Sequence, residues 1–227
     1  MKKIAVCPAL KNLPKSRKQR AALFHEELKK LYPAPRCALE YGGDPFRLLV
    51  MGRLSAQCKD SRVNEVAEVL FARFPTVGAI AAAPLEELEA ICRPCGVFRV
   101  KAKNIQDASR ILLAEYGGKV PAEREKLMAL PGVGEKICNL LLGDVFGDPQ
   151  IVADTHCIRI SNRLCLAETE NPSGVVKALE KVIPKEERSD FCHRVVDFGR
   201  DVCSAPRANC AACPLFPKGC GSHPEEL

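Results

Sequence analysis

The stretch LPGVGEKICN, residues 130–139, decides how this chain is organised. A proline and two glycines interrupt a helical pattern, and a new helix is expected to begin at once, with Lys136 in its first turn. Glycine permits positive φ and close approach of the backbone to another group. The stretch therefore predicts a tight hairpin between two helices. It leaves three interpretations of Lys136: a solvated side chain, a phosphate contact or a nucleophile.

The start of the second helix is suited to bind an anion. Its first N–H groups have no intrahelical partner and lie at the positive end of the helix dipole. A phosphate oxygen bound there would position a nucleic acid without reading its bases. A lone pair of glycines would favour a corner without a ligand, but LPGVG with a helix on each side favours a phosphate-binding helix-hairpin-helix. The dipole also favours the neutral amine that imine chemistry needs at Lys136, although position alone favours a phosphate contact.

Helical spacing of apolar residues fills most of the remaining chain. Asp44 is expected to cap one helix, with Pro45 at its first position. The nearest approach to a strand pattern is PQIVA, residues 149–153. The fold class is therefore all-α, with helices expected within residues 16–32, 44–57, 61–74, 84–92, 99–117, 121–130, 154–166, 172–183 and 189–203.

The charge of the chain is unevenly distributed. Residues 1–36 hold ten Lys or Arg and two acidic residues, whereas the remainder holds 24 basic and 26 acidic residues. This basic arm indicates a polyanionic partner, and a solvated, partly disordered N-terminus is the alternative. Apolar runs are short and interrupted, so we expect neither a signal peptide nor a membrane span, and a cytoplasmic protein.

Four of the thirteen cysteines lie together near the C-terminus. Cys203, Cys210, Cys213 and Cys220 have the spacing C-x6-C-x2-C-x6-C, which indicates a shared metal. A central pair flanked by single cysteines favours an iron–sulfur cluster over zinc, which usually takes two close pairs; zinc is the alternative. Most of the other cysteines are expected to be small buried hydrophobic residues in a reducing cell.

Two further features complete the site expected from the sequence. Asp154 precedes a helical run, where it is expected either to cap that helix or to face the hairpin as a carboxylate. Cys92 and Cys95 form a separate C-x-x-C, CRPC, which lacks the strand–helix setting of a thioredoxin motif. A redox role for this pair is therefore not favoured.

These motifs together resemble a known family. LPGVGEK, a Gly/Pro-rich turn and ADTH are similar to the helix-hairpin-helix-GPD superfamily of DNA glycosylases, and LSAQCKDSRVN and the terminal cysteines resemble its endonuclease III branch. The resemblance implies two helical domains with a DNA cleft between them. Residues 1–37 and 149–227 would form a discontinuous iron–sulfur-cluster domain, and residues 38–148 a six-helix domain with the hairpin.

The resemblance also implies a chemistry. Lys136 matches the lysine that attacks the sugar C1′, displaces the base and forms a Schiff base, which undergoes β-elimination. Asp154 matches the carboxylate that assists departure of the base, and an ionised carboxylate would favour the positive charge that develops on the sugar. The chain would thus be a bifunctional glycosylase and AP lyase that removes damaged pyrimidines, with a 4Fe–4S cluster on the four cysteines.

The same resemblance implies the contacts with DNA. Gln57 matches the residue that fills the gap left by the extruded nucleotide, and Val97 stands where the family places a larger apolar wedge. Ile137 and Cys138 replace the Thr-Ala that commonly follows this lysine, so we expect a changed substrate range. The partner is double-stranded DNA with damaged bases or abasic sites, bound by a monomer through Gln57, Val97, Leu130, Gly132, Val133, Gly134 and Arg207.

Three other functions stay open at this point. A monofunctional or mismatch-specific glycosylase, for adenine or thymine, belongs to the same superfamily, and Lys136 argues against the adenine branch, which usually lacks it. A non-catalytic iron–sulfur protein that binds DNA is opposed by the presence of both Lys136 and Asp154. A zinc-ribbon-type binding module is the third alternative.

Overall fold

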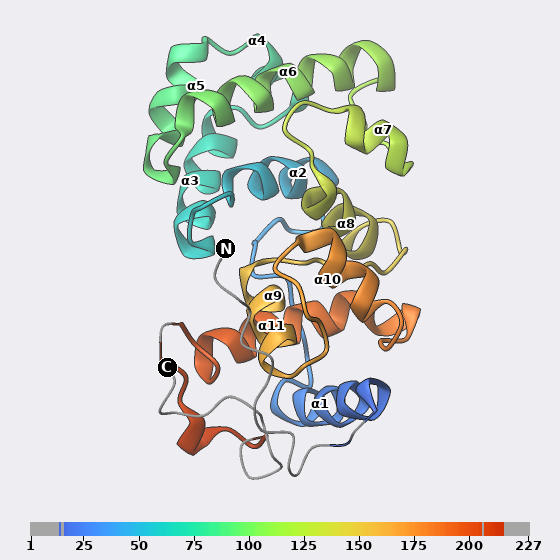
Figure 1. Ribbon diagram of the computed structural model, residues 1–227. Coiled ribbons are helices and arrows are strands. Elements are labelled where there is room, and N and C mark those ends of the chain that lie inside the picture. The colour runs from blue at the N-terminus through green and yellow to red at the C-terminus, as the bar shows by residue number, and fades with distance from the viewer. Residues whose placement is uncertain (1–13, 15, 206, 216–227) are drawn as a thin grey trace. The chain divides into compact units, whose positions relative to one another are not determined.

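A computed structural model describes residue 14 and residues 16–205 and 207–215. Within these residues all regular structure is helical, which confirms the all-α class (Figure 1). No helix in this part of the chain is long and apolar enough to cross a membrane. The chain folds into two compact units. We call Cys37–Asp148 the central unit, and Met1–Arg36 with Pro149–Leu227 the split unit.

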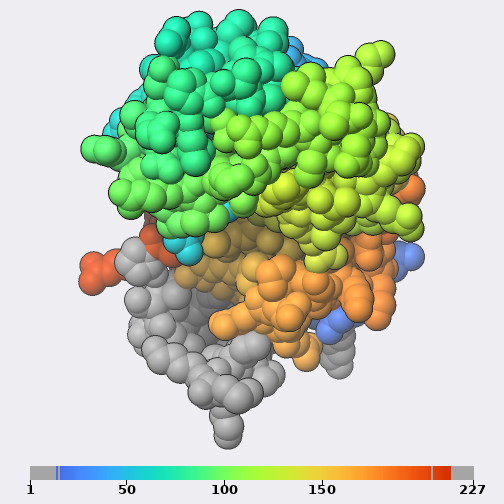
Figure 2. Space-filling view, turned by 90° about the horizontal axis from the view of Figure 1, so that it is seen from above, coloured from blue at the N-terminus to red at the C-terminus, as the bar shows by residue number. Residues whose placement is uncertain are grey.

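Short helices packed around one long helix make up the central unit. The long helix α6 packs extensively against α4 and α5, while α2 packs against α8. The segments coloured teal to yellow-green in Figure 2 form a continuous face of this unit. Its described elements are α2 (Pro45–Leu54), α3 (Asp60–Arg73), α4 (Val77–Ala82), α5 (Leu85–Cys92), η1 (Arg93–Cys95), α6 (Phe98–Tyr116), α7 (Arg124–Ala129) and α8 (Glu135–Asp144).

Local capping explains where two of these helices begin. The Asp44 carboxylate accepts the N–H groups of Phe46 and Arg47 at 2.8 and 3.2 Å, which confirms the predicted cap of α2. Helix α4 was not predicted, because its six residues, VGAIAA, are too few to show a helical period. Thr76 supplies the signal that was available, since its hydroxyl accepts the N–H of Ala79 at 3.1 Å.

The contact between α2 and α8 explains the unusual residues after Lys136. Ile137 and Cys138 are 8% and 0% exposed. A Cβ added to Gly52 of α2 would lie 3.3 Å from Ile137 Cγ2, so the two helices pack closely at this point. Both side chains therefore fill the interior of the central unit and do not face a ligand directly.

The split unit joins the N-terminal helix to the C-terminal helices through a shared core. α11 packs against α1 and α9, and the ring of Phe24 lies edge-on to Phe191 and Phe198, with centroids 6.0 and 5.6 Å apart. Residues 149–153 form no strand, and Ile151 is fully buried in this core. The described elements are α1 (Arg17–Leu31), α9 (Thr155–Arg163), α10 (Pro172–Leu179), η2 (Lys185–Glu187), α11 (Arg188–Asp201) and η3 (Cys210–Ala212).

Candidate functional site

Two buried apolar residues anchor the hairpin between α7 and α8. Leu130 and Val133 are 2% and 6% exposed, and the N–H of Val133 donates to the carbonyl of Leu130 at 3.1 Å. Their side chains face the interior of the central unit. The hairpin can therefore offer only the backbone of these two residues to a ligand.

The two glycines of the hairpin have different structural roles. Gly132 has φ of 79°, and a Cβ there would lie 2.6 Å from Arg53 Nε and 2.7 Å from the side-chain amide group of Asn104. Gly134 has extended backbone (φ −99°, ψ −179°), and within the described part of the chain nothing lies within 4 Å of a Cβ added to it. The fold thus requires glycine at position 132, whereas at position 134 glycine keeps an open surface.

Lys136 projects from the first turn of α8. The residue is exposed, and among the described residues its ammonium has no hydrogen-bond or ion-pair partner. Gly134, as the N-cap, has no side chain to accept the first N–H groups of α8, and no side-chain cap is present among the described residues. The start of α8 therefore offers both an amine and backbone donors to a ligand.

Gln57 and Val97 share an unusual backbone conformation. Their φ angles are 55° and 45°, in the left-handed region that non-glycine residues rarely adopt. Both side chains are exposed, Val97 to 59%. A residue held in a strained conformation with its side chain exposed is characteristic of a binding site.

Asp154 lies in the split unit as the N-cap of α9. Its Oδ1 accepts the N–H of Cys157 at 2.7 Å, so the predicted cap is confirmed. The carboxylate is partly exposed, and Oδ2 accepts no hydrogen bond from the described residues. One oxygen is therefore committed to the fold and the other is available for chemistry.

Three of the four clustered cysteines line one pocket in the split unit. Cys203, Cys210 and Cys213 share it with apolar side chains that include Ile160 and Leu215. Cys220 lies outside the described residues. The presence of three half-buried cysteines around one pocket is consistent with a shared ligand.

Two arginines of α9 hold the first of these cysteines. Arg159 donates to the carbonyl of Cys203 through Nε at 3.3 Å and Nη2 at 2.9 Å, and Arg163 Nη1 lies 3.1 Å from Cys203 Sγ. Sequence reasoning missed both residues. Their spacing of four, directly after Asp154, places them on one side of a helix and was the available signal.

Arg207 is exposed in the loop between Cys203 and Cys210. Its carbonyl accepts the hydroxyl of Ser204, while its guanidinium has no hydrogen-bond or ion-pair partner in the described part of the chain. This cation is therefore available for an anionic ligand.

The C-x-x-C pair lies inside the central unit as thiols. Burial raises the pKa of both Cys92 and Cys95 to about 12, so both are protonated at neutral pH. Thiolates carry redox and metal chemistry, and protonated buried thiols are inert. The surroundings of the pair are thus those of core residues.

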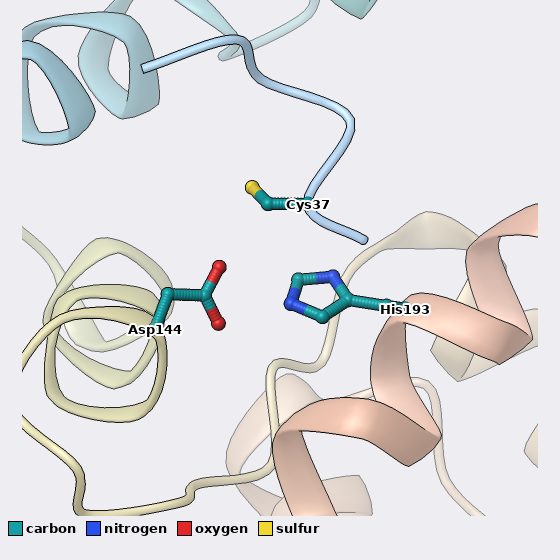
Figure 3. Close-up of side chains that lie close together, drawn as sticks. All are labelled: Cys37, Asp144 and His193. Atoms are coloured by element: carbon teal, nitrogen blue, oxygen red, sulfur yellow. The ribbon is translucent and has the colours of Figure 1, made fainter. Parts of the chain in front are cut away.

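Cys37 has a similar environment at the start of the central unit. Figure 3 draws its thiol and the carboxylate of Asp144; the third side chain, His193, belongs to α11 of the split unit. Burial, and then the negative charge of Asp144, raise the pKa of Cys37 to about 12. Cys37 therefore also remains a thiol at neutral pH.

The hairpin and the capped carboxylate lie within a stretch that matches a family model, whereas Cys203, Cys210 and Cys213 lie beyond that stretch. The model of the HhH-GPD superfamily of base excision DNA repair proteins matches residues 50–185, and the chain belongs to this family. The resemblance inferred from the motifs is thereby confirmed. The chain is a DNA glycosylase and AP lyase of base excision repair.

Particular relatives cover most of the chain. Endonuclease III of Synechocystis sp. is 42% identical over 88% of this chain and 91% of its own length. Endonuclease III of Bacillus subtilis is 40% identical over 84% of this chain and 87% of its own. The structure of a trapped endonuclease III–DNA covalent intermediate matches 89% of this chain and 95% of that chain, with a TM-score of 0.85 and 42% identity.

Proposed function

We propose that this enzyme excises damaged pyrimidines from duplex DNA and then cleaves the abasic site, with Lys136 as the nucleophile. The observation that carries the proposal is the exposed Lys136, in the first turn of α8, whose ammonium has no partner among the described residues. A relative of 42% identity has been seen covalently joined to DNA, which supports a nucleophile in the matched fold. Lysine is a residue type that forms such an adduct with a sugar aldehyde carbon.

The reaction begins when the neutral Lys136 amine attacks C1′ of the damaged nucleotide. The C1′–N bond breaks, and the base leaves with the electron pair and takes up a proton. Loss of the amine proton and opening of the sugar give a Schiff base between Nζ and C1′. Removal of a C2′ proton then expels the 3′-phosphate by β-elimination, and water releases the lysine.

Asp154 stabilises the positive charge that develops on the sugar as the base departs. A fixed carboxylate favours an oxocarbenium-like centre more than it favours the ground state. The available Oδ2 can also accept the proton of the attacking amine. Because Oδ1 accepts the Cys157 N–H, the carboxylate has a fixed orientation in the split unit.

The DNA contacts follow from what each residue exposes. Backbone N–H groups at Gly134 and the start of α8 bind a phosphate, and Arg207 supplies a further cation. Gln57 offers an amide to the orphaned base, and Val97 offers apolar surface to the gap in the stack. The left-handed backbone at both positions supports roles that need a projecting side chain.

Borohydride trapping tests the role of Lys136. The protein is incubated with duplexes that carry thymine glycol or an abasic site, and borohydride reduces any Schiff base to a stable adduct. We expect an adduct with wild type and none with Lys136→Ala, with strand cleavage reduced by about 10³-fold or more. Lys119→Ala, which removes another exposed lysine of the central unit, is the control and should trap normally.

Two outcomes would contradict this role. Strand cleavage that is undiminished in Lys136→Ala would remove the lysine from the mechanism. Base release from wild type without any adduct would indicate a monofunctional glycosylase that uses water. Release of mismatched adenine or thymine, with no release of damaged pyrimidine, would overturn the proposed substrate class.

The cysteine pocket fits a 4Fe–4S cluster held by Cys203, Cys210, Cys213 and Cys220. The three cysteines that the structure describes line one pocket, and the Arg163 N–H that approaches Cys203 Sγ suits a thiolate that carries negative charge. The bound cluster would stabilise the loop of Arg207 and take no part in base release, which transfers no electrons. Arg159 holds the Cys203 carbonyl and so orients the ligand.

Elemental analysis of the purified protein tests the cofactor. We expect about four iron and four sulfide per chain and a brown colour. Cys203→Ser is expected to lose most of the iron, whereas Cys37→Ser, outside the pocket, keeps it. Colourless protein with one zinc per chain would overturn the iron–sulfur assignment.

A further inference from the structure

Lys101 is a buried cation in the first turn of α6, and no step proposed above uses it. The residue is 1% exposed. Its Nζ donates to the carbonyls of Leu54 at 2.8 Å, Ala56 at 2.7 Å and Cys95 at 2.7 Å. A neutral amine has only two N–H groups, so three carbonyl acceptors require the charged ammonium. All its donors are satisfied, which is the condition under which a buried charge is tolerated.

The three carbonyls belong to the ends of two helices in the central unit. Leu54 ends α2, with Ala56 two residues beyond, and Cys95 ends η1. The last carbonyls of a helix lack intrahelical partners and lie at the negative end of its dipole. The ammonium of Lys101 therefore caps two helix ends at once and joins segments that are 47 and 6 residues away in the chain.

Each capped end leads directly into one of the two strained residues. Ala56 precedes Gln57, and Cys95 is followed by Gly96 and Val97. The N–H of Lys101 also donates to the carbonyl of Val97 at 3.2 Å. A left-handed non-glycine residue costs about 1–2 kcal/mol, so the surrounding structure must hold it. The hydrogen bonds of the Lys101 ammonium to the Ala56 and Cys95 carbonyls hold the backbone just before both strained residues.

We infer that Lys101 is a positioning residue for base excision. Its ammonium holds the segment that follows α2 and contains Gln57 at a fixed distance from the segment that follows η1 and contains Val97. The inference rests on the proposed function, in which both side chains enter the gap left by the damaged nucleotide. Extrusion of a base costs a few kcal/mol. Gln57 and Val97 can offset that cost together only if the distance between them is fixed before DNA binds. If they became ordered on binding, the lost conformational entropy would weaken binding.

Two substrates separate positioning from simple stability. A duplex with a damaged pyrimidine needs the gap to be filled, whereas an abasic site in a single strand has neither a base to extrude nor an orphaned partner. Lys101→Met, which keeps the length and removes the donors, should lower excision from the duplex by about tenfold to a hundredfold. Cleavage of the single strand should stay within about twofold of wild type, because Lys136 is intact.

The matched control is Lys103→Met, two residues along the same helix. Lys103 is exposed and pairs with Asp107 at 2.6 Å. Its loss should leave both substrates within about twofold of wild type, as for an exposed ion pair. If Lys101→Met does not accumulate as folded protein, Lys101→Arg, which keeps a cationic donor, is compared with wild type on the same two substrates. For Lys101→Met or Lys101→Arg, an equal loss of activity on the duplex and on the single strand would overturn the inference.

A protein that already lacks the Gln57 and Val97 side chains gives the decisive measurement. In the Gln57→Ala/Val97→Ala background, Lys101→Met should cost less than about threefold more in duplex excision, because the side chains it positions are gone. A further loss as large as that in wild type would show a structural role and overturn the inference. If the background protein itself excises at the wild-type rate, the proposed roles of Gln57 and Val97 fail first, before Lys101 is changed.

Discussion

In the central unit the backbone positions the residues proposed to act on DNA, whereas in the split unit side-chain hydrogen bonds position the proposed functional residues. Gln57 and Val97 project from left-handed residues, and Lys136 projects from a helix start that no side chain caps within the described residues. Asp154, by contrast, is held by a hydrogen bond to its own helix, and Cys203 is held by two arginines.

The difference follows from what each group has to do. A side chain that enters DNA or attacks a sugar must be free of protein partners, so only its backbone can be fixed. A carboxylate or a metal thiolate must keep its charge and orientation, which hydrogen bonds to that group provide. Preorganisation in the central unit therefore fixes the backbone and leaves the side chain free, whereas in the split unit it fixes the charged group itself.

Among the effects that test this comparison of the two units, the largest is expected at Asp154, where one substitution separates charge from capping. Asp154→Asn keeps an oxygen for the Cys157 N–H but removes the negative charge, and asparagine caps helices as well as aspartate does. We expect base excision to fall by about 10²-fold, because stabilisation of the developing cation is lost, with little change in unfolding midpoint. Excision is measured by single-turnover release of thymine glycol.

Asp44→Asn in the central unit is the matched control, since Asp44 also caps a helix. It should leave excision within about twofold of wild type. Equal losses in the two variants would mean that capping, and not charge, accounts for the effect at Asp154.

A smaller effect distinguishes the two glycines of the hairpin. Gly132→Ala is expected to destabilise the protein by about 2–3 kcal/mol, because φ is 79° and the new Cβ would overlap Arg53 and Asn104. Gly134→Ala should cost less than about 1 kcal/mol, because its backbone is extended and open, yet it should weaken DNA binding where the phosphate approaches.

Urea unfolding and salt-dependent DNA binding measure the two variants. The comparison fails if Gly134→Ala is the less stable protein, or if it binds DNA as wild type does. The first result would overturn the different backbone roles of the two glycines, and the second would remove the phosphate contact from the start of α8.

The smallest effect is a pH dependence confined to the split unit. His25 of α1 is 4% exposed, and burial lowers its pKa below 6.5, with Lys29 and Arg194 acting in the same direction and Glu187 and Glu26 opposing them. Below pH 6.5 the unfolded chain then binds a proton that the folded chain does not. The free energy of unfolding should therefore fall as the pH drops from 8 to 5.5.

His25→Gln isolates this contribution, because every other titratable group is the same in the two proteins. Urea unfolding at pH 8 and 5.5 should show a weaker pH dependence in the variant. Glu187 accepts a hydrogen bond from the Lys29 ammonium, which lowers its pKa, so this group adds a loss of stability only below about pH 4.5, outside this range. An identical pH dependence in the two proteins would contradict the assignment to His25.

Local features of the fold could be predicted from the sequence, and long-range ones could not. The caps at Asp44 and Asp154 and the hairpin at Gly132 depend on neighbouring residues, so their signals are local. α4 was missed because its signal is too short. Nothing in the sequence shows which glycine of the hairpin needs positive φ, because that depends on Arg53 and Asn104.

The sequence by itself determined the helical class and the family, and it predicts which residues carry the chemistry, since periodicity, capping and motif spacing are read within a few residues. Only the tertiary structure decided that Lys101 caps two helix ends, that Arg163 approaches the Cys203 sulfur and that Gln57 and Val97 are strained. Each of these depends on groups far apart in the chain. A buried charged group meets its hydrogen-bond acceptors only when the chain has packed, so no local sequence pattern predicts which groups they are.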